Sequence, residues 1–325
     1  MPPRRQFHNT LNDLLHNIFY HTEAIGKVLH NYGAKQKDDE LSWSTPARLD
    51  KISHFKDYAQ DSNIPKGSAK KTIVAEKPVN EDHAYVDEKI TKDAVETIKR
   101  LAEQDVPFFL AVGFMKPHSP YNAPKEYWDL YQREDMKALC SETRPEGVPD
   151  LNRWDSIEIR GFTDIPDKGS IPPETAARMR HGYYAATSYA DANIGKVINA
   201  LETSGAADNT IIVFWSDHGY HLGENGHWAK VTLRELDAQA PLLISLPSKE
   251  SANTNAIVEY IDLYPTLSEL CSLPQPTDID GKSFVPVLEN PKSEFRQTAL
   301  TQAVSYTHLR AHETVLDLVC RLLLE

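Results

Sequence analysis

The residues best suited to chemistry follow an apolar run in the second half of the chain. Residues 211–215 are β-branched or aromatic, Asp217 and His218 come directly after them, and a loop with several glycines leads to Lys230. An interior strand of an α/β sheet delivers polar side chains to the sheet edge in this way. A carboxylate beside an imidazole, with a lysine close behind, suits a metal ion that shares its site with an anionic substrate. The alternative is an ordinary turn in which Asp217 caps a helix.

A histidine that follows another apolar run is a candidate for proton transfer. Residues 108–114 form a continuous apolar run, typical of a buried parallel strand, and His118 follows it between Pro117 and Pro120. Because prolines restrict the backbone, the ring can be aimed at a site. Imidazole also titrates in the range that acid–base catalysis uses. The alternative is a loop histidine without a catalytic role.

These polar residues need a sheet that brings them together. Apolar runs of strand length alternate with stretches of helical periodicity, which predicts an α/β fold with a mostly parallel sheet and helices on both faces. The expected strands are 24–25, 108–114, 210–215 and 241–246, and the expected helices are 8–20, 87–104 and 173–201. Two polar segments without clear periodicity, 33–78 and 121–173, are expected to be surface inserts.

Composition narrows the class of protein. The chain has 325 residues, of which 40% are hydrophobic and 25% charged, as in ordinary globular proteins. A net charge of −12 without a basic stripe argues against a nucleic-acid partner. The three cysteines have neither metal-ligand spacing nor the even count of a disulfide framework. No apolar run approaches the length of a membrane segment.

The string around Asp217 resembles a known family. Ser216-Asp-His-Gly-Tyr-His-Leu-Gly-Glu-Asn-Gly-His-Trp-Ala-Lys230 is similar to the sulfatase signature of the alkaline-phosphatase-like superfamily, and most similar to the branch that contains iduronate-2-sulfatase. Further blocks resemble the family, in its order, at 24–30, 107–120, 183–191, 258–267 and 280–284. The resemblance implies an incomplete sulfatase catalytic domain over residues 1–303, interrupted by the two inserts.

The resemblance implies hydrolysis of sulfate esters and gives these residues roles. Asp217 would bind a calcium ion together with an acidic pair and a formylglycine nucleophile, and His218 would either join them or donate to a sulfate oxygen. Lys230 and Lys27 would bind sulfate oxygens, and His30 would steady the nucleophile. Without the resemblance, Lys27 and His30 would be read as a helix-end pair, and Lys230 as a solvated surface lysine.

Four further residues are considered on the substrate side. His118 would protonate the departing alcohol or donate to a sulfate oxygen, and Lys116 would contact a uronate carboxylate. His227 and His221 are expected either to pack the loop or, for His227 above all, to contact the substrate. A zinc site with His218 is not predicted, because the spacing does not place these histidines on one helical face and no cysteine accompanies them.

Two elements of the family pattern are missing where they belong, before Lys27. These are an Asp-Asp strand end and the formylglycine precursor, which is Cys or Ser followed by x, Pro or Ala, x and Arg; residues 1–22 contain neither a cysteine nor adjacent aspartates. Cys140 and Arg144 have the right separation, but Glu142 stands where Pro or Ala belongs, so we interpret that string as coincidence. We therefore expect an N-terminally truncated fragment that lacks its nucleophile and is inactive.

The other end of the chain also departs from the family pattern, directly after Ala303. Residues 304–314 resemble the translation of a sequencing-library adaptor, and we interpret 304–325 as a read-through tail. The alternative is an amphipathic C-terminal helix.

Taken with the resemblance, the sequence predicts a sulfuric ester hydrolase that acts on a sulfated, uronic-acid-type saccharide. One alternative is a phosphatase or phosphodiesterase of the same superfamily, which would hold two metal ions with more Asp and His ligands downstream. Another is a non-catalytic protein that binds sulfated glycans. The family suggests a periplasmic, secreted or lysosomal compartment, and the oligomeric state is left open.

Overall fold

The structure, a computed structural model, divides the chain into two compact units. The larger unit spans 19–247, and the smaller one includes residues from 248 onward. The described residues are 20–28, 42–49, 54–66, 72–79, 84–136 and 157–301. Apart from Tyr20, the expected helix 8–20 lies outside the described residues, as does the tail 304–325. The expected single domain over 1–303 stays a prediction, since compact units are not by themselves folding domains.

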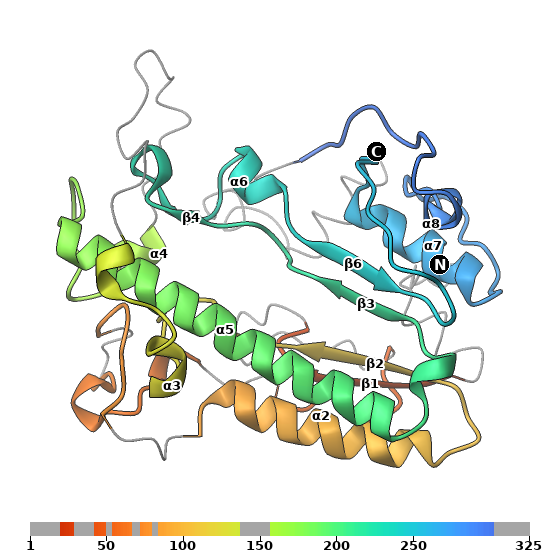
Figure 1. Cartoon of the computed structure of the whole chain (residues 1–325), viewed down its shortest axis with the longest axis horizontal. Coiled ribbons are helices and arrows are strands. Elements are labelled where there is room, and N and C mark those ends of the chain that lie inside the picture. Colours follow the sequence, from red (N-terminus) through yellow and green to blue (C-terminus); the bar gives the residue numbers. More distant parts are fainter. Residues whose placement is uncertain are drawn as a thin grey trace, which may run out of the picture. The chain divides into compact units, whose positions relative to one another are not determined.

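The larger unit contains both helices and strands throughout its length, which confirms the α/β class (Figure 1). In chain order the elements are β1 (His21–Gly26), α2 (Val86–Ala102), β2 (Phe108–Gly113), α3 (Lys125–Trp128), α4 (Ile157–Arg160), α5 (Pro173–Thr203), β3 (Ile212–Trp215), β4 (His221–Leu222), β5 (Trp228–Ala229), α6 (Glu235–Ala238) and β6 (Leu242–Ser245). The four expected strands correspond to β1, β2, β3 and β6, and the two later expected helices to α2 and α5.

β1 and β2 form a parallel pair covered by α2. Ile90 and Ala94 recur at helical spacing on α2 and are fully buried in the cluster between helix and strands. At the carboxyl ends of the strands, Gly26 and Gly113 are partners in register. A Cβ atom on Gly113 would lie 2.0 Å from the carbonyl oxygen of Lys27. The two glycines therefore allow the segments that leave β1 and β2 to lie close together.

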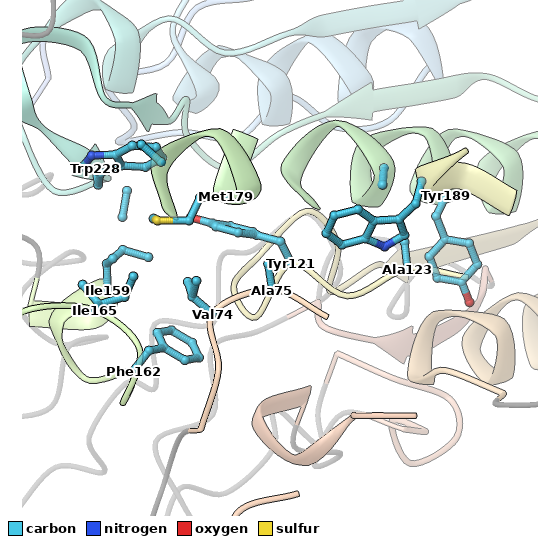
Figure 2. Packing of buried hydrophobic residues seen from close by; sticks show 14 of the residues in the cluster. Val74, Ala75, Tyr121, Ala123, Ile159, Phe162, Ile165, Met179, Tyr189 and Trp228 are labelled. Atoms are coloured by element: carbon cyan, nitrogen blue, oxygen red, sulfur yellow. The ribbon is translucent and has the colours of Figure 1, made fainter. Parts of the chain in front are cut away.

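The long helix α5 organises the main core of the larger unit (Figures 1 and 2). It begins with Pro173 in its first turn, as the sequence predicts, and packs against α2 and α3. Met179 and Tyr189 point into the core from its buried side. Gly182 lies where a Cβ atom would be 3.0 Å from Trp128, so the helix packs tightly here. Although α5 has 31 residues, no helix among the described residues is long and apolar enough to cross a membrane.

The segments predicted to be surface inserts supply much of this core. Val74 and Ala75 come from the first, and Tyr121 and Phe162 from the second (Figure 2). Trp128, also from the second, belongs to the same cluster. Each of these residues is at most 3% exposed. The prediction of surface inserts was therefore wrong for these parts. Single apolar residues in a polar stretch can be buried without any periodicity, so a pattern search does not find them.

The remaining strand pairs of the larger unit are antiparallel. β3 pairs with β6, with Val213 opposite Ile244, and the short β4 pairs with β5. The antiparallel pairing of β3 differs from the mostly parallel sheet that the sequence predicts. A short apolar run does not reveal the direction of its partner strand. The β4–β5 hairpin turns the chain back after the Asp-His-Gly sequence, and this return positions Lys230.

The smaller unit contains α7 (Leu263–Leu270) and α8 (Val285–Glu289), which pack on each other. Its polar centre is Asp262, a fully buried carboxylate that Arg296 contacts through Nε at 2.9 Å and Nη2 at 2.5 Å. The backbone N–H groups of Glu259 and Lys282 donate to the same carboxylate. Burial would raise the pKa of Asp262, but these hydrogen bonds outweigh it and lower the pKa.

Candidate functional site

The predicted site residues of the larger unit follow the ends of four strands. Lys27 follows β1, His118 follows β2, Asp217 and His218 follow β3, and Lys230 follows β5. Nζ of Lys27 lies 3.8 Å from Oδ2 of Asp217, and Nε2 of His218 lies 3.5 Å from Oδ1 of the same carboxylate. The charges of Lys27 and Lys230 both act on the ring of His118. The structure therefore brings these residues together, and we call them the site cluster.

The two lysines of the site cluster are held close to each other. Burial lowers the pKa of Lys27, the Asp217 carboxylate opposes that shift, and the charge of Lys230 adds to the lowering. Cations that approach in a partly buried site repel each other unless an anion lies between them. The electrostatics of the site cluster therefore favour binding of an anion.

The backbone around Lys230 is strained. Ala229 and Val231 have φ angles of 67° and 79°, in the left-handed region that residues with a side chain seldom adopt. For a β-branched residue such as Val231 this conformation is a true outlier, and such strain tends to cluster at functional sites. The surrounding contacts must therefore fix Lys230 in place.

Asp237 of α6 supplies several of these contacts. Its carboxylate accepts hydrogen bonds from Nδ1 of His221 at 2.9 Å and from the backbone N–H of Thr232 at 2.6 Å. Its carbonyl accepts the N–H of Gly219 at 2.8 Å. His221 is fully buried, which fits loop packing rather than a ligand role. His227 is half-buried, with its ring 5.7 Å from that of His221, and its contact with a substrate stays a prediction.

His118 presents one nitrogen to the site cluster. Nδ1 donates to the carbonyl of Ser119 at 2.7 Å, and Nε2 lies 3.3 Å from Oε1 of Glu158. Burial, followed by the charge of Lys230 and then that of Lys27, lowers the pKa of the imidazole well below 6.5. Without a bound anion the ring is therefore neutral near pH 7. An anion between the lysines would raise the pKa and favour the protonated form that an acid needs.

Lys116 does not join the site cluster. It is 6% exposed, and its Nζ donates to the carbonyl of Pro120 at 2.7 Å. The fully buried end of α2 contributes Asp87, whose carboxylate accepts the N–H groups of Met115 and Lys116 at 2.8 and 2.9 Å. The predicted contact between Lys116 and a uronate carboxylate therefore needs correction. The ammonium group is buried, and its hydrogen bond to Pro120 stabilises the loop that carries His118.

Glu158 is a member of the site that the sequence did not indicate. This α4 residue places Oε1 3.3 Å from Nε2 of His118 and Oε2 3.6 Å from Nζ of Lys230. Oγ of Ser119 donates to Oε1 at 2.9 Å. Glu158 lies in the segment 121–173, where no periodicity or family block marks it, so no sequence signal could have found it.

The described residues alone do not fit a calcium ion. Asp217 is 65% exposed and could serve as an oxygen ligand. His218 could offer only its Nε2 nitrogen, because its Nδ1 donates to the carbonyl of Gly219 at 2.6 Å. No group of three or more His, Cys, Asp or Glu side chains able to hold a metal ion occurs among the described residues. Calcium takes about six to eight oxygen ligands. We therefore derive no chemical step through calcium.

The calcium affinity of the chain is expected to be weak for this reason. Isothermal titration calorimetry of the chain with calcium chloride should show no binding in the micromolar range, because Asp217 and His218 provide too few oxygens. Micromolar affinity that disappears in Asp217→Ala would contradict this prediction and would mean that another part of the chain completes the site.

A string that does fit the family's nucleophile pattern, Ser44-Thr-Pro-Ala-Arg48, runs beside β1, and its Ser44 lies at the start of that strand. Ser44 pairs with Thr22 at the start of β1, through N–H to carbonyl at 2.8 Å and through its Oγ to the N–H of Thr22 at 3.0 Å. Lys27 follows the opposite end of the same strand. The predicted residue His30 and the Cys140 string lie outside the described residues.

Comparisons with known proteins identify relatives of this chain. A family model described as Sulfatase matches residues 1–273. The chain is 30% identical to the iduronate 2-sulfatase of Mus musculus over 305 residues, which cover 82% of this chain and 54% of that protein. It is 33% identical to a sulfatase of Formosa agariphila over 286 residues, which cover 83% of this chain and 53% of that protein. The chain thus spans about half the length of these curated relatives.

Solved structures show the fold. A phosphonate monoester hydrolase from Silicibacter pomeroyi superposes with a TM-score of 0.66 at 22% identity, over 89% of this chain and 63% of that chain. A protein solved in complex with its substrate D-glucosamine-2-N,6-O-disulfate superposes with a TM-score of 0.63 at 22% identity, over 89% of this chain and 66% of that chain.

Proposed function

This chain belongs to the sulfatase family, and on that premise we propose that its larger unit carries part of the active site of a sulfuric ester hydrolase acting on a sulfated, uronic-acid-type saccharide. The observation that supports the proposal is the convergence of Lys27, His118 and Lys230 from separate strand ends. Fixed cations stabilise charge that develops on sulfate oxygens during the reaction, and they need no reorganisation to do so.

Each residue would contribute a separate part of the reaction. The ammonium groups of Lys27 and Lys230 would bind sulfate oxygens. Nε2 of His118, protonated once the anion is bound, would donate its proton to the oxygen of the departing alcohol. Asp217 would contribute one oxygen ligand to a calcium ion, and no step of the reaction is assigned to that ion, because the described residues do not complete its coordination. The described part of the site cluster would bind the sulfate group and protonate the leaving alcohol, and it contains no formylglycine.

Binding of a simple sulfate ester tests this proposal. Titration of the chain with phenyl sulfate, followed by ligand-observed NMR, should give saturable binding that weakens at least about tenfold in Lys230→Ala or Lys27→Ala, because each loses a charge-assisted hydrogen bond. Lys196→Ala, which removes an exposed lysine from α5, is the matched control and should leave the affinity unchanged. Equal affinities in all of these variants would contradict the proposal.

His118 should also make the stability of the chain depend on pH. Its pKa lies well below 6.5 in the folded chain, because of burial and the charges of Lys230 and Lys27, whereas the unfolded chain titrates near 6.5. Below pH 6.5 the unfolded state therefore binds the proton first, and stability is lost as the pH falls toward the folded pKa. In urea titrations between about pH 7.5 and 5, His118→Gln should lose less stability than the unaltered chain. Parallel pH profiles would contradict this prediction.

The alternatives make different predictions for the same assays. One alternative is a phosphatase or phosphodiesterase, since the fold is also similar to that of a phosphonate monoester hydrolase. Such an enzyme would bind phenyl phosphate in preference to phenyl sulfate. A non-catalytic protein that binds sulfated glycans would bind a sulfated oligosaccharide without any dependence on His118.

A further inference from the structure

A carboxylate lies inside the site cluster, beside the groups that would hold the substrate anion. The two oxygens of Glu158 contact His118 at 3.3 Å and Lys230 at 3.6 Å. The hydroxyl of Ser119 donates to one of these oxygens at 2.9 Å, which fixes the carboxylate in this position. The side chain is 22% exposed, so water screens its charge only in part. Any anion bound by Lys230 and His118 must therefore lie close to a fixed negative charge.

We infer that Glu158 is a specificity-determining residue that selects the substrate anion by its charge. It favours singly charged sulfate monoesters over doubly charged phosphate monoesters of the same shape. The inference rests on the proposed function, because it concerns the anion that the site cluster binds.

The physical basis is the charge that distinguishes two otherwise similar anions. A sulfate monoester carries one negative charge near pH 7, whereas a phosphate monoester carries nearly two, because its second pKa is about 6. Lys27 and Lys230 attract both anions, but Glu158 repels the second charge of the phosphate as well as the first. Hydrogen-bond donors alone separate the two poorly, since both anions present three oxygens in a tetrahedral arrangement. Repulsion between like charges a few Å apart in a partly screened site corresponds to roughly tenfold selectivity.

Asp217 contributes less to this selection. Its carboxylate is 65% exposed, and it lies 3.8 Å from Lys27, so solvent and the lysine both reduce its effect on a bound anion. The pairing of Glu158 with both His118 and Lys230 makes it the carboxylate whose removal should change the preference most.

Glu158→Gln isolates the charge. The amide keeps the shape of the side chain, and its oxygen can still accept the hydrogen bond from Ser119. We would measure the affinities of the full chain for phenyl sulfate and for phenyl phosphate at about pH 7.5, where phosphate is dianionic, by ligand-observed NMR. We expect Glu158→Gln to bind phenyl phosphate about tenfold more tightly and phenyl sulfate only a few-fold more tightly. Glu202→Gln removes the same charge at the exposed end of α5 and should leave the ratio of the affinities unchanged.

A second measurement uses the pH. Between about pH 5 and 7.5 phenyl phosphate gains its second charge while phenyl sulfate does not, so the advantage that Glu158→Gln gives to phenyl phosphate over phenyl sulfate should grow as the pH rises. Protonation of His118 affects both ligands, so its contribution largely cancels in the ratio.

The outcomes separate this inference from the proposed function. A ratio that is unchanged in Glu158→Gln, or that changes equally in Glu202→Gln, overturns the role of Glu158. If phenyl sulfate binding still depends on Lys230, the proposed function stands without it. A chain that binds no phenyl sulfate at all overturns both.

Discussion

The chain should hydrolyse no aryl sulfate above the uncatalysed rate. Enzymes of this kind depend on a covalent nucleophile, and the family forms it as an aldehyde on a Cys or Ser in a defined string. The site cluster consists of lysines, histidines and an aspartate, with no such residue among its members. Loss of a covalent nucleophile lowers the catalytic rate by about a millionfold. Release of 4-nitrophenol from 4-nitrophenyl sulfate, with and without calcium, measures this directly.

Two variants make the assay decisive. Ser44 belongs to a string that fits the family pattern, but it pairs with Thr22 at the start of β1, at the end remote from Lys27. Cys140 belongs to a string that fits only in part. Calcium-dependent turnover at the rate of an intact sulfatase would contradict the prediction, and its disappearance in Ser44→Ala or Cys140→Ala would identify the nucleophile.

The part of the site that sequence could predict is the part that local pattern encodes. An apolar run that ends in a polar residue marks a strand end, and parallel strand ends lie near each other at one edge of a sheet. Lys27 and His118 follow the ends of the parallel strands β1 and β2, Asp217 follows the end of β3, and the structure brings all three residues together. The prediction of α2 and α5 succeeded for a similar reason, since helical periodicity extends over many residues and tolerates single exceptions.

The part that sequence could not predict depends on contacts between distant segments. Lys116 and His118 follow the same strand two residues apart, and nothing local shows that the lysine is buried against Pro120 while the imidazole faces the site. Glu158 reaches the site only because its segment packs beside β5, and a carboxylate in a polar stretch is the least distinctive of residues. Tyr121 and Trp128 were hidden by the polar composition around them, although both are core residues.

A large loss of stability is expected from a carboxylate buried within β1. Glu23 is fully buried and accepts hydrogen bonds from Arg48, Arg100 and His21, each at 2.6 Å. Burial alone would raise its pKa, but these bonds outweigh that effect and lower it to about 2. Glu23→Ala leaves two arginines in a partly buried position without their common acceptor. Breaking a buried ion pair from one side costs about 3–5 kcal/mol, a large share of the free energy of unfolding of an ordinary domain.

Urea denaturation followed by circular dichroism checks this expectation, with Glu96→Ala on the exposed side of α2 as the control. The control should change the free energy of unfolding by no more than about 0.5 kcal/mol. Because the pKa of Glu23 is depressed in the folded chain, its contribution is complete above the unfolded pKa of 4.5 and is lost as the pH falls toward about 2. The stability difference between the unaltered chain and Glu23→Gln should therefore shrink over that range. A difference that stays constant with pH would mean that Glu23 acts through packing rather than through its charge.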